Sequence, residues 1–391
     1  MNERILHKDV QDFIQQNLKS NIAQLVLKGS PFEDVSIQEI ANQIVSKQKS
    51  EKKLPTWFQT EGIFFPPKLN LEQTSSEITA AYKSRLIKGE SLIDITGGFG
   101  VDSYAFSKHF QEVNHCEINE ELSKIAAYNF KKLGVSNVQF TTENGLDIVK
   151  NSTKAFDCIY ADPSRRSNHK GKVFLLDDCE PNIPENIDLL LQKANHILLK
   201  VSPILDITSA INELKNVKEV HVVAVNNEVK ELLFLLERSY EDSIKIKTTN
   251  FQRNNQQEFE FILGTNEHSN YSNPKEFLYE PNAAIMKSGG FHKITSSFNV
   301  YKLHQNSHLF TSNEHIEFPG RVFKIIKILP YDKKKMKKQL SLKKANITTR
   351  NFSKSVDEIR KELKIKDGGI DYLFFTTESS NKQVCIHCKK S

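Results

Sequence analysis

The stretch from Ser91 to Gly100, SLIDITGGFG, constrains the fold of this chain more than any other segment. Its apolar residues up to Ile95 predict a short buried strand, which the glycine turn of Gly97, Gly98 and Gly100 ends. Residues 101–110 then show helical spacing, so the turn is expected to lead into a helix. Glycine lets a ligand approach bare backbone amides, and this order of elements places a nucleotide-like ligand at the carboxyl end of a parallel sheet.

The turn lacks the residues of two common nucleotide-binding motifs, which excludes two classes of ligand. A dinucleotide fingerprint needs a third glycine where this chain has Ser103, and a P-loop needs a Gly-Lys-Ser/Thr that does not follow. The residue that stands before the glycines is an acid, Asp94. An acid at this point suits a ligand that carries an ammonium group better than it suits a diphosphate.

Two further polar residues follow the next two predicted strands. Residues 113–117 end in Glu117, about 20 residues after the glycine turn, where a doubly wound fold places the carboxylate that binds ribose hydroxyls. Residues 138–140 form the next strand, and Asn144 lies in the loop after it, next to Glu143. Because parallel strands end at one edge of the sheet, Asp94, Glu117 and Asn144 are expected to face one ligand.

In these features the chain resembles the class I S-adenosylmethionine-dependent methyltransferases, whose first motif is an acidic residue followed by a glycine turn. The resemblance implies S-adenosylmethionine as the cofactor and assigns the adenine edge to Asn144. It implies a cofactor site made of Asp94, Thr96, Gly97, Gly98, Gly100, Asp102, Glu117, Ile118, Asn144, Gly145, Asp162, Gln73 and Ser75. For Gln73, Ser75 and the neighbouring Ser76, the alternative is that they only cap a helix.

The next predicted strand, residues 156–161, runs directly into Asp162-Pro163-Ser164-Arg165-Arg166. Amino-methyltransferases of nucleic acids carry Asp/Asn-Pro-Pro-aromatic here, and the acid or amide orients an exocyclic amine for in-line transfer. The resemblance therefore makes Asp162, Pro163, Ser164 and Arg165 the catalytic motif, with a base nitrogen as the acceptor. Ser164 replaces the second proline, and Arg165 replaces the aromatic that would stack on a flipped base. A guanidinium can stack on a base or hold a phosphate, so Arg165 and Arg166 are expected to contact one of these.

A second polar motif, Asp177-Asp178-Cys179-Glu180, follows the catalytic one. A metal site would need further His or Cys partners at suitable spacing, and none is present. A covalent cysteine of the 5-methylcytosine type would stand in a Pro-Cys motif, which is absent here. We therefore interpret Asp177 and Asp178 as substrate-loop or helix-capping residues, and we expect no metal.

The secondary structure of the other segments is predicted from the spacing of their apolar residues and from their prolines. Residues 1–80 predict helices, among them one from Ser36 to Val45, while prolines make residues 54–57 and 64–67 extended. Residues 71–83 predict one capped helix. Residues 196–203 and 220–225 predict the fifth and sixth strands, and residues 259–263 the final antiparallel one. Lys200 and Ser202 either face the substrate or simply end their strand, and residues 227–236 either form a helix or border the cleft.

The charge of the chain is concentrated at its end. Residues 319–391 hold 19 Lys and Arg against 7 Asp and Glu, whereas the remaining residues hold 35 against 41. A basic domain on a mildly acidic body is typical of a protein that binds a polyanion, and the alternative is a solvated lysine-rich face. The segment also predicts a βαβαββ order, and with ANITTRNF and KIKDGGIDY it resembles the THUMP-like domain of a bacterial methyltransferase family. That resemblance implies an RNA partner such as tRNA, because THUMP domains occur in tRNA-modifying enzymes.

Composition excludes other classes of protein. No run of 18 apolar residues is present, and the first 18 residues lack a signal-peptide core, so we expect a cytoplasmic protein without a membrane span. Five cysteines at irregular spacing fit a reducing compartment, and Cys385-Ile-His-Cys388 alone is weak evidence for zinc.

The sequence therefore predicts a doubly wound α/β fold with a seven-stranded, Rossmann-like methyltransferase sheet. The expected parts are a helical region with an extended lead-in over residues 1–80, the methyltransferase domain over 81–265, a connecting region over 266–318 and a basic THUMP-like domain over 319–391. The expected function is methyl transfer to structured RNA, tRNA or rRNA. The alternatives are methylation of a protein or small molecule, and a non-catalytic RNA-binding protein that keeps only the cofactor fold.

Overall fold

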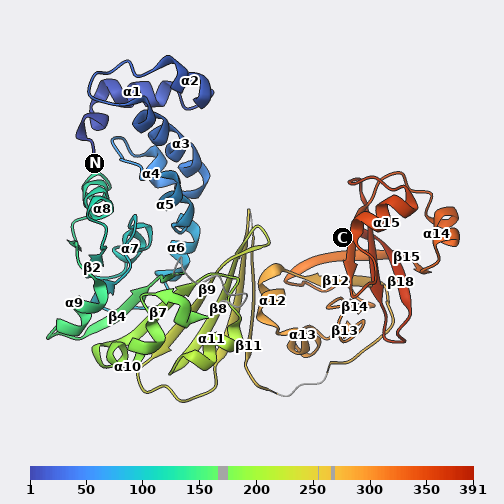
Figure 1. The fold of residues 1–391 in the computed structure, drawn as a ribbon. Helices are drawn as coiled ribbons and strands as arrows, with labels where there is room; N and C mark the ends of the chain where they lie inside the picture. The colour runs from blue at the N-terminus through green and yellow to red at the C-terminus, as the bar shows by residue number, and fades with distance from the viewer. Residues whose placement is uncertain (166–174, 254, 266–268) are drawn as a thin grey trace. The chain divides into compact units, whose positions relative to one another are not determined.

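The computed structural model describes residues 1–165, 175–253, 255–265 and 269–391 (Figure 1). The chain divides into two compact units. The first consists of residues 1–218 with 233–241, and the second of residues 219–232 with 242–391. No helix among the described residues is long and apolar enough to cross a membrane.

The first unit begins with seven short helices. They are η1 Glu3–Leu6, α1 Lys8–Gln16, α2 Ile22–Lys28, α3 Ile37–Lys53, α4 Pro55–Gln59, α5 Lys68–Gln73 and α6 Glu77–Lys83. Ser36 caps α3 in a capping box with Glu39, as the sequence predicted, although α3 continues beyond Val45. Two predictions are wrong. Pro55 begins helix α4 because proline is tolerated in a first helical turn, and residues 71–83 form two helices because Ser76 caps α6 afresh.

The first sheet has the predicted doubly wound arrangement, but over the described residues it contains nine strands rather than the predicted seven. Six of them are β1 Ser91–Asp94, β2 Glu112–Cys116, β3 Val138–Thr141, β4 Phe156–Ala161, β7 Ala194–Val201 and β9 Glu228–Glu237, in the order β9-β7-β4-β1-β2-β3. The boundary between the two units falls within β9. The pairs from β3 to β7 are all parallel. The intervening helices are α7 Val101–Phe106, α8 Glu120–Lys132, α9 Gly145–Asn151, α10 Ile183–Lys193 and α11 Ile207–Glu213.

The predicted final antiparallel strand at residues 259–263 is confirmed. These residues fall largely in β11 Asn255–Ile262, which pairs antiparallel with β10 Lys245–Gln252 at one edge of the sheet, in the order β11-β10-β8-β9. The hairpin of β8 Val217–Val225 and β9 was not predicted. Its strands are joined by Asn226 and Asn227, which both have positive φ, as a two-residue hairpin turn requires. Residues 227–236 fall largely in β9 and do not form a helix. Their apolar run Leu232–Leu236 is buried throughout, which is typical of a central strand with both faces covered.

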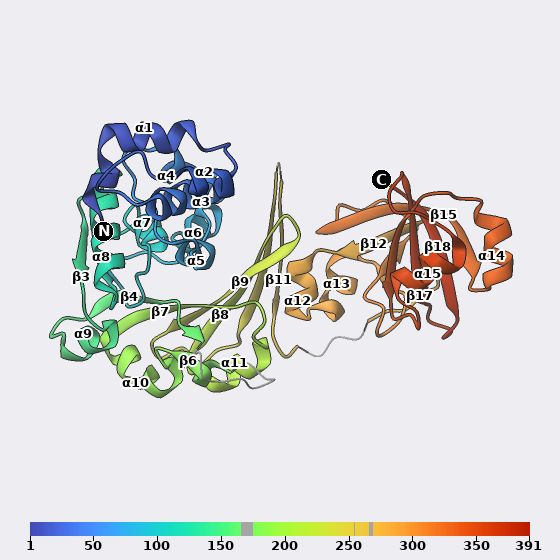
Figure 2. The same ribbon diagram turned by 45° about the horizontal axis from the view of Figure 1, so that its top comes forward.

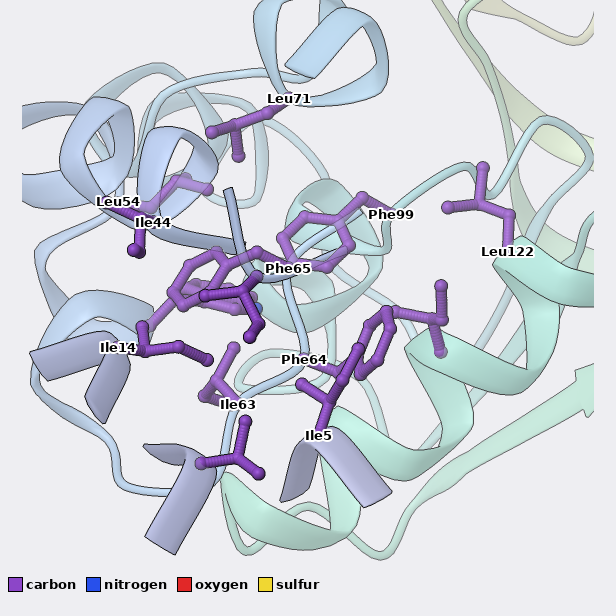
Figure 3. Packing of buried hydrophobic residues seen from close by; sticks show 14 of the residues in the cluster. Ile5, Ile14, Ile44, Leu54, Ile63, Phe64, Phe65, Leu71, Phe99 and Leu122 are labelled. Carbon is purple, nitrogen blue, oxygen red and sulfur yellow. The ribbon is translucent and has the colours of Figure 1, made fainter. Parts of the chain in front are cut away.

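The N-terminal helices share one hydrophobic core with the elements around the glycine turn (Figures 1 and 3). Ile44 of α3 and Leu71 of α5 belong to the same cluster as Phe99 of the turn and Leu122 of α8. Phe65, in the extended Pro-rich segment, also belongs to it, and its backbone exchanges hydrogen bonds with the buried side chain of Gln43. Folding of the helical region is therefore tied to the geometry of the turn.

A second sheet, of seven strands, makes up most of the second unit (Figure 2). Its strands are β12 Phe277–Pro281, β13 Tyr301–Lys302, β14 Phe310–Ser312, β15 Gly320–Pro330, β16 Asn346–Arg350, β17 Asp371–Thr377 and β18 Gln383–Lys390, in the order β13-β14-β12-β15-β18-β17-β16. Its helices are α12 Ala283–Ser288, α13 Phe291–Phe298, α14 Lys333–Leu340 and α15 Val356–Leu363. From residue 320 onward the order is βαβαββ, as predicted.

This sheet buries both of its faces. Leu373 and Phe375 of β17 belong to the core of α14 and α15, whereas Phe374 between them belongs to a second core with Phe323 and Leu278. The segment expected to be a connecting region therefore supplies strands and core residues of this same sheet. The predicted linker at 266–273 lies partly outside the described residues.

Two polar residues of the segment Tyr279–Ile285 (YEPNAAI) stabilise this sheet and its helix α12. Glu280 is buried and accepts hydrogen bonds from Arg321 of β15 and from Arg350 of β16, the latter at 3.0 Å. Asn282 caps α12 by accepting from the backbone N–H of Ile285 at 3.0 Å.

The shared core predicts that one truncation in α3 destabilises the first unit. Ile44→Ala removes a fully buried side chain and leaves a cavity, so the free energy of unfolding is expected to fall by about 2–5 kcal/mol. Leu27→Ala, in α2, is the matched control because that side chain is 86% exposed, and a change within about 0.5 kcal/mol is expected. Urea unfolding measures both; equal effects of the two changes would contradict the shared core.

Candidate active site

The glycine turn follows β1 and is held against β2. The amide of Gly97 donates to the carbonyl oxygen of Cys116 at 2.8 Å, and a Cβ at Gly97 would lie 2.4 Å from the ring of His115. Gly98 and Gly100 have φ of 57° and 89°, the left-handed region that glycine adopts without strain. The sequence predicted glycine here for the approach of a ligand, and the structure adds a second reason at Gly97, where a buried ring leaves no room.

Asp94, at the end of β1, is buried and braces this turn. One carboxylate oxygen accepts from the amide of Thr96 at 3.0 Å, and the other accepts from the hydroxyl of Ser103 at 2.6 Å. Burial raises the pKa of Asp94 to about 7, and the charges of Asp102 and Asp162 add to the rise. Asp94 thus holds the start of α7 as well as facing the cleft described below.

A second buried acid, Asp102 in the first turn of α7, is the centre of a polar network. One carboxylate oxygen accepts from the hydroxyls of Ser75 and Tyr160, each at 2.8 Å, and the other lies 3.1 Å from the ammonium of Lys83. Lys83 is fully buried and also donates to Ser75 at 3.0 Å. Burial alone would raise the pKa of Asp102, but Lys83 and Lys200 outweigh it and leave that pKa lowered.

These elements line a cleft beside the glycine turn. The cleft brings together eight of the residues predicted for the cofactor site: Gln73, Ser75, Asp94, Thr96, Gly97, Gly98, Asp102 and Asp162. Its apolar wall includes Phe99 and Leu122, which belong to the core in Figure 3. Ser75 lines this cleft and donates to Asp102 rather than capping a helix, whereas Ser76 caps α6.

The residues expected at the ribose and adenine lie beside the cleft rather than in its wall. Glu117 accepts from the amide of Gly98 at 2.9 Å, which ties the end of β2 to the glycine turn. Ile118, next to it, is 75% exposed. Asn144 is exposed and caps α9 by accepting from the amide of Leu146 at 2.9 Å. Its neighbour Gly145 is buried with no room for a side chain, since a Cβ there would lie 2.5 Å from Ile95.

Asp162 follows β4 and is fixed from two sides. Its amide donates to the hydroxyl of Thr96 at 2.7 Å, and its carboxylate forms an ion pair with Lys200 of β7. The two side chains are mostly buried, with 31% of Asp162 and 12% of Lys200 exposed. From the sequence, Lys200 could either contact the substrate or simply end its strand. In the structure it pairs with Asp162, the predicted catalytic acid.

The two polar motifs after β4 meet in a short ladder. β5 Ser164–Arg165 pairs antiparallel with β6 Cys179–Glu180. Cys179 is buried, and Asp178 accepts from the amide of Leu175 at 3.3 Å at the start of the 3-10 helix η2 Leu176–Asp178, which is a capping role. The predicted contacts of Arg165 and Arg166 fall outside the described residues, because the Arg165 side chain and the whole of Arg166 are not described.

No cluster of three His, Cys, Asp or Glu side chains is placed to hold a metal ion within the described ranges. All five cysteines are free and buried, including Cys385 and Cys388 of β18.

Comparison with known proteins identifies the family of the chain. A THUMP domain-like family model matches residues 320–390, and a ferredoxin-like domain model matches residues 277–319. The chain is 30% identical to a candidate methyltransferase from Porphyromonas gingivalis W83, whose crystal structure superposes with a TM-score of 0.88 over 100% of this chain and 99% of that chain. A search of curated proteins finds no match.

Other solved structures match only part of the chain. An rRNA methylase from Streptococcus thermophilus is 13% identical, with a TM-score of 0.30 over 42% of this chain and 98% of that chain. A candidate methyltransferase from Streptococcus mutans in complex with SAH is 16% identical, with a TM-score of 0.31 over 41% of this chain and 96% of that chain. The assignment therefore depends on the full-length relative. The chain belongs to the class I S-adenosylmethionine-dependent methyltransferases that carry a C-terminal THUMP-like domain.

Sequence reasoning missed Lys83 and Tyr160 and undervalued Lys200. A lysine in the last turn of a helix is commonly exposed and stabilises the helix dipole. For that reason the sequence carried no sign that Lys83 is buried. Lys200 carried a usable signal, because it is a charged residue in an otherwise apolar strand end between the buried Leu199 and Val201.

The raised pKa of Asp94 predicts a pH dependence of stability. An acid whose pKa is higher in the folded state contributes stability that is full below its unfolded pKa near 4 and is lost as pH rises through about 7. The free energy of unfolding of the native chain, minus that of Asp94→Asn, should therefore fall between pH 5 and pH 7, by up to about 1.4 kcal/mol per pH unit.

Urea unfolding of both proteins at pH 5, 6, 7 and 8 measures this difference. The comparison with Asp94→Asn is needed because burial lowers the pKa of His115 to about 4, and its contribution runs in the opposite direction. A difference that does not change with pH would contradict the account of Asp94.

Proposed function

We propose that this chain transfers a methyl group from S-adenosylmethionine to structured RNA. The observation that carries the proposal is the cleft at the ends of β1 and β4, which brings Asp94, Asp102 and Asp162 together beside the glycine turn. The described residues that line the cleft include these three acids and no Lys or Arg, which favours a cationic ligand over a phosphate. Lys83 and Lys200 each pair with one of the acids from outside this lining. The family of the chain supports a sulfonium nucleoside as the cation.

The residues of the cleft fit such a cofactor. Gly98 offers room, since a Cβ there would meet nothing closer than the Thr96 carbonyl oxygen at 3.8 Å, so its backbone is open to close approach. In this proposal Glu117 holds the ribose hydroxyls, the exposed Ile118 and Gly145 flank the adenine, and Asn144 reads its edge. Gln73 and Ser75 bind the methionine end.

When bound, the cofactor supplies a methyl group activated by the positive charge on sulfur. The protein orients the acceptor and keeps water out. Holding activated reactants in the right geometry accelerates the transfer. Asp162 has the position for this work, because Thr96 holds its backbone and Lys200 its carboxylate. The Asp-Pro-Ser-Arg motif taken alone would make the acceptor a base nitrogen.

The RNA part of the proposal is supported by the THUMP-like domain and by its charge. Helix α14 presents Lys333, Lys334, Lys337 and Lys338 to solvent while Met336 is buried in its core. Lysines on one exposed helix suit contact with RNA phosphates, which are read by charge and shape. In this proposal, the basic domain over 319–391 binds the RNA and the methyltransferase domain over 81–265 modifies it.

Methyl transfer is tested with the purified chain, tritiated S-adenosylmethionine and total RNA from a strain that lacks the protein. We expect label in RNA, and we expect Asp162→Ala to lower the rate by about 10²-fold or more while the variant still binds adenosylhomocysteine. Label in protein or in small molecules but not in RNA would overturn the RNA substrate. Full transfer by Asp162→Ala would remove that residue from the mechanism.

The basic helix gives a separate prediction for RNA binding. Changing Lys333, Lys334, Lys337 and Lys338 together to glutamine should weaken RNA binding about tenfold or more near 0.15 M salt, and should flatten its salt dependence, because fewer counterions are released. The matched control changes the four exposed lysines Lys8, Lys19, Lys28 and Lys52, which alters the net charge equally. Equal losses in both variants, measured by filter binding over a salt series, would show that α14 is not a specific RNA contact.

A further inference from the structure

Asp162 does not stand alone at the candidate acceptor position, because Lys200 is paired with it. We infer that the methyl acceptor is a hydroxyl oxygen, in RNA the ribose 2′-hydroxyl, bound by the paired side chains of Asp162 and Lys200. The inference rests on the proposed function and replaces the base nitrogen that the motif alone predicts.

The sheet brings the two side chains together. β4 and β7 are parallel neighbours, and Ala161 lies opposite Leu199, so Asp162 and Lys200 occupy the next positions on the two strands. Both strands reach their carboxyl ends here, the edge at which ligands bind in this class of sheet. The neighbours of Lys200 in β7, Leu199 and Val201, are buried. Their burial holds β7 in place, and with it the Lys200 side chain that pairs with Asp162.

A hydrogen-bond inventory argues against an exocyclic amine at this position. Such an amine has two N–H donors and one lone pair, and that lone pair must attack the methyl group. It therefore needs two acceptors from the protein. Asp162 supplies acceptor oxygens, but a lysine ammonium has only donors, and a donor aimed at the amine would compete for its lone pair.

A hydroxyl uses both partners. Its O–H donates to the carboxylate of Asp162, one lone pair accepts from the ammonium of Lys200, and the second lone pair is left for the methyl group. The positive charge of Lys200 also stabilises the negative charge that grows on the oxygen as its proton leaves. In RNA the 2′-hydroxyl is the group that offers both a donor and acceptors on every nucleotide.

The step balances with the groups at hand. The acceptor oxygen forms the C–O bond with its lone pair while the C–S bond of the cofactor breaks and its electron pair stays on sulfur. The hydroxyl proton passes to the carboxylate of Asp162 and from there to solvent. The products are a methyl ether, adenosylhomocysteine and one proton, so no oxidant or further reactant is required.

Alkaline hydrolysis of the labelled RNA distinguishes the two acceptors. A 2′-O-methyl group removes the hydroxyl that attacks the neighbouring phosphodiester, so we expect the tritium in alkali-resistant dinucleotides. Tritium in mononucleotides, carried on a base, would overturn the inference and leave the proposed function intact. Absence of label from all RNA would contradict the RNA substrate itself, and the inference with it.

Variants of Lys200 test its part in the step. Lys200→Met removes the donors at similar length and should lower kcat by about 10²-fold to 10³-fold, whereas Lys200→Arg keeps donors and charge and should stay within about tenfold of the native chain. Binding of adenosylhomocysteine, measured by calorimetry, should change less than about threefold in both, which separates a role at the acceptor from a failure to fold.

The matched control is Lys215→Met, because Lys215 also forms an ion pair with an aspartate, the exposed Asp188 at 2.8 Å, and no change is expected there. Full activity of Lys200→Met, or an equal loss in Lys200→Arg and Lys200→Met with cofactor binding retained, would contradict donation by Lys200.

Discussion

Thr96 joins the two halves of the site through its backbone and its side chain, and the rest of the arrangement depends on it. Its amide donates to Asp94 at the end of β1, and its hydroxyl accepts from the amide of Asp162 at the end of β4. The glycine turn, where the cofactor is proposed to bind, and the acid proposed to orient the acceptor are therefore held at a fixed separation. In-line transfer needs such a fixed separation, because small displacements of the reacting groups cost orders of magnitude in rate.

The chain keeps this separation by burying charge on both sides of the turn. Asp102 is stabilised by Lys83, and Asp162 by Lys200, so each of these two acids has its own cation. The donors to Asp94 among the described residues are neutral, and its pKa is raised. Buried pairs of this kind cost desolvation energy and are weak evidence for stability. Their role here is to fix the positions of the two carboxylates. The helices of residues 1–83 supply Ser75 and Lys83 to the network and close one core around Phe99, so the N-terminal region is part of the site.

Much of the fold was predictable, and the failures have physical reasons. Strands β1 to β4 and helix α3 follow from local signals, namely short apolar runs, glycines and the capping residue Ser36. β9 was not predicted because Leu232–Leu236 is buried on both faces, which removes the alternation that identifies a strand. Of the site, the motif residues were predictable because each follows a strand. Lys83 was not, since its role arises from a contact with Asp102 that is distant in sequence. Lys200 carried a signal, but its pairing with Asp162 is visible only in the structure.

A calorimetric titration of the full chain with adenosylhomocysteine tests the central claim most directly. The account predicts binding at one site per chain, and it predicts weaker binding by Glu117→Ala, because that carboxylate is assigned to the ribose and is tied to Gly98. Absence of binding heat, or equal affinity in Glu117→Ala, would contradict the assignment of the glycine turn as a cofactor site.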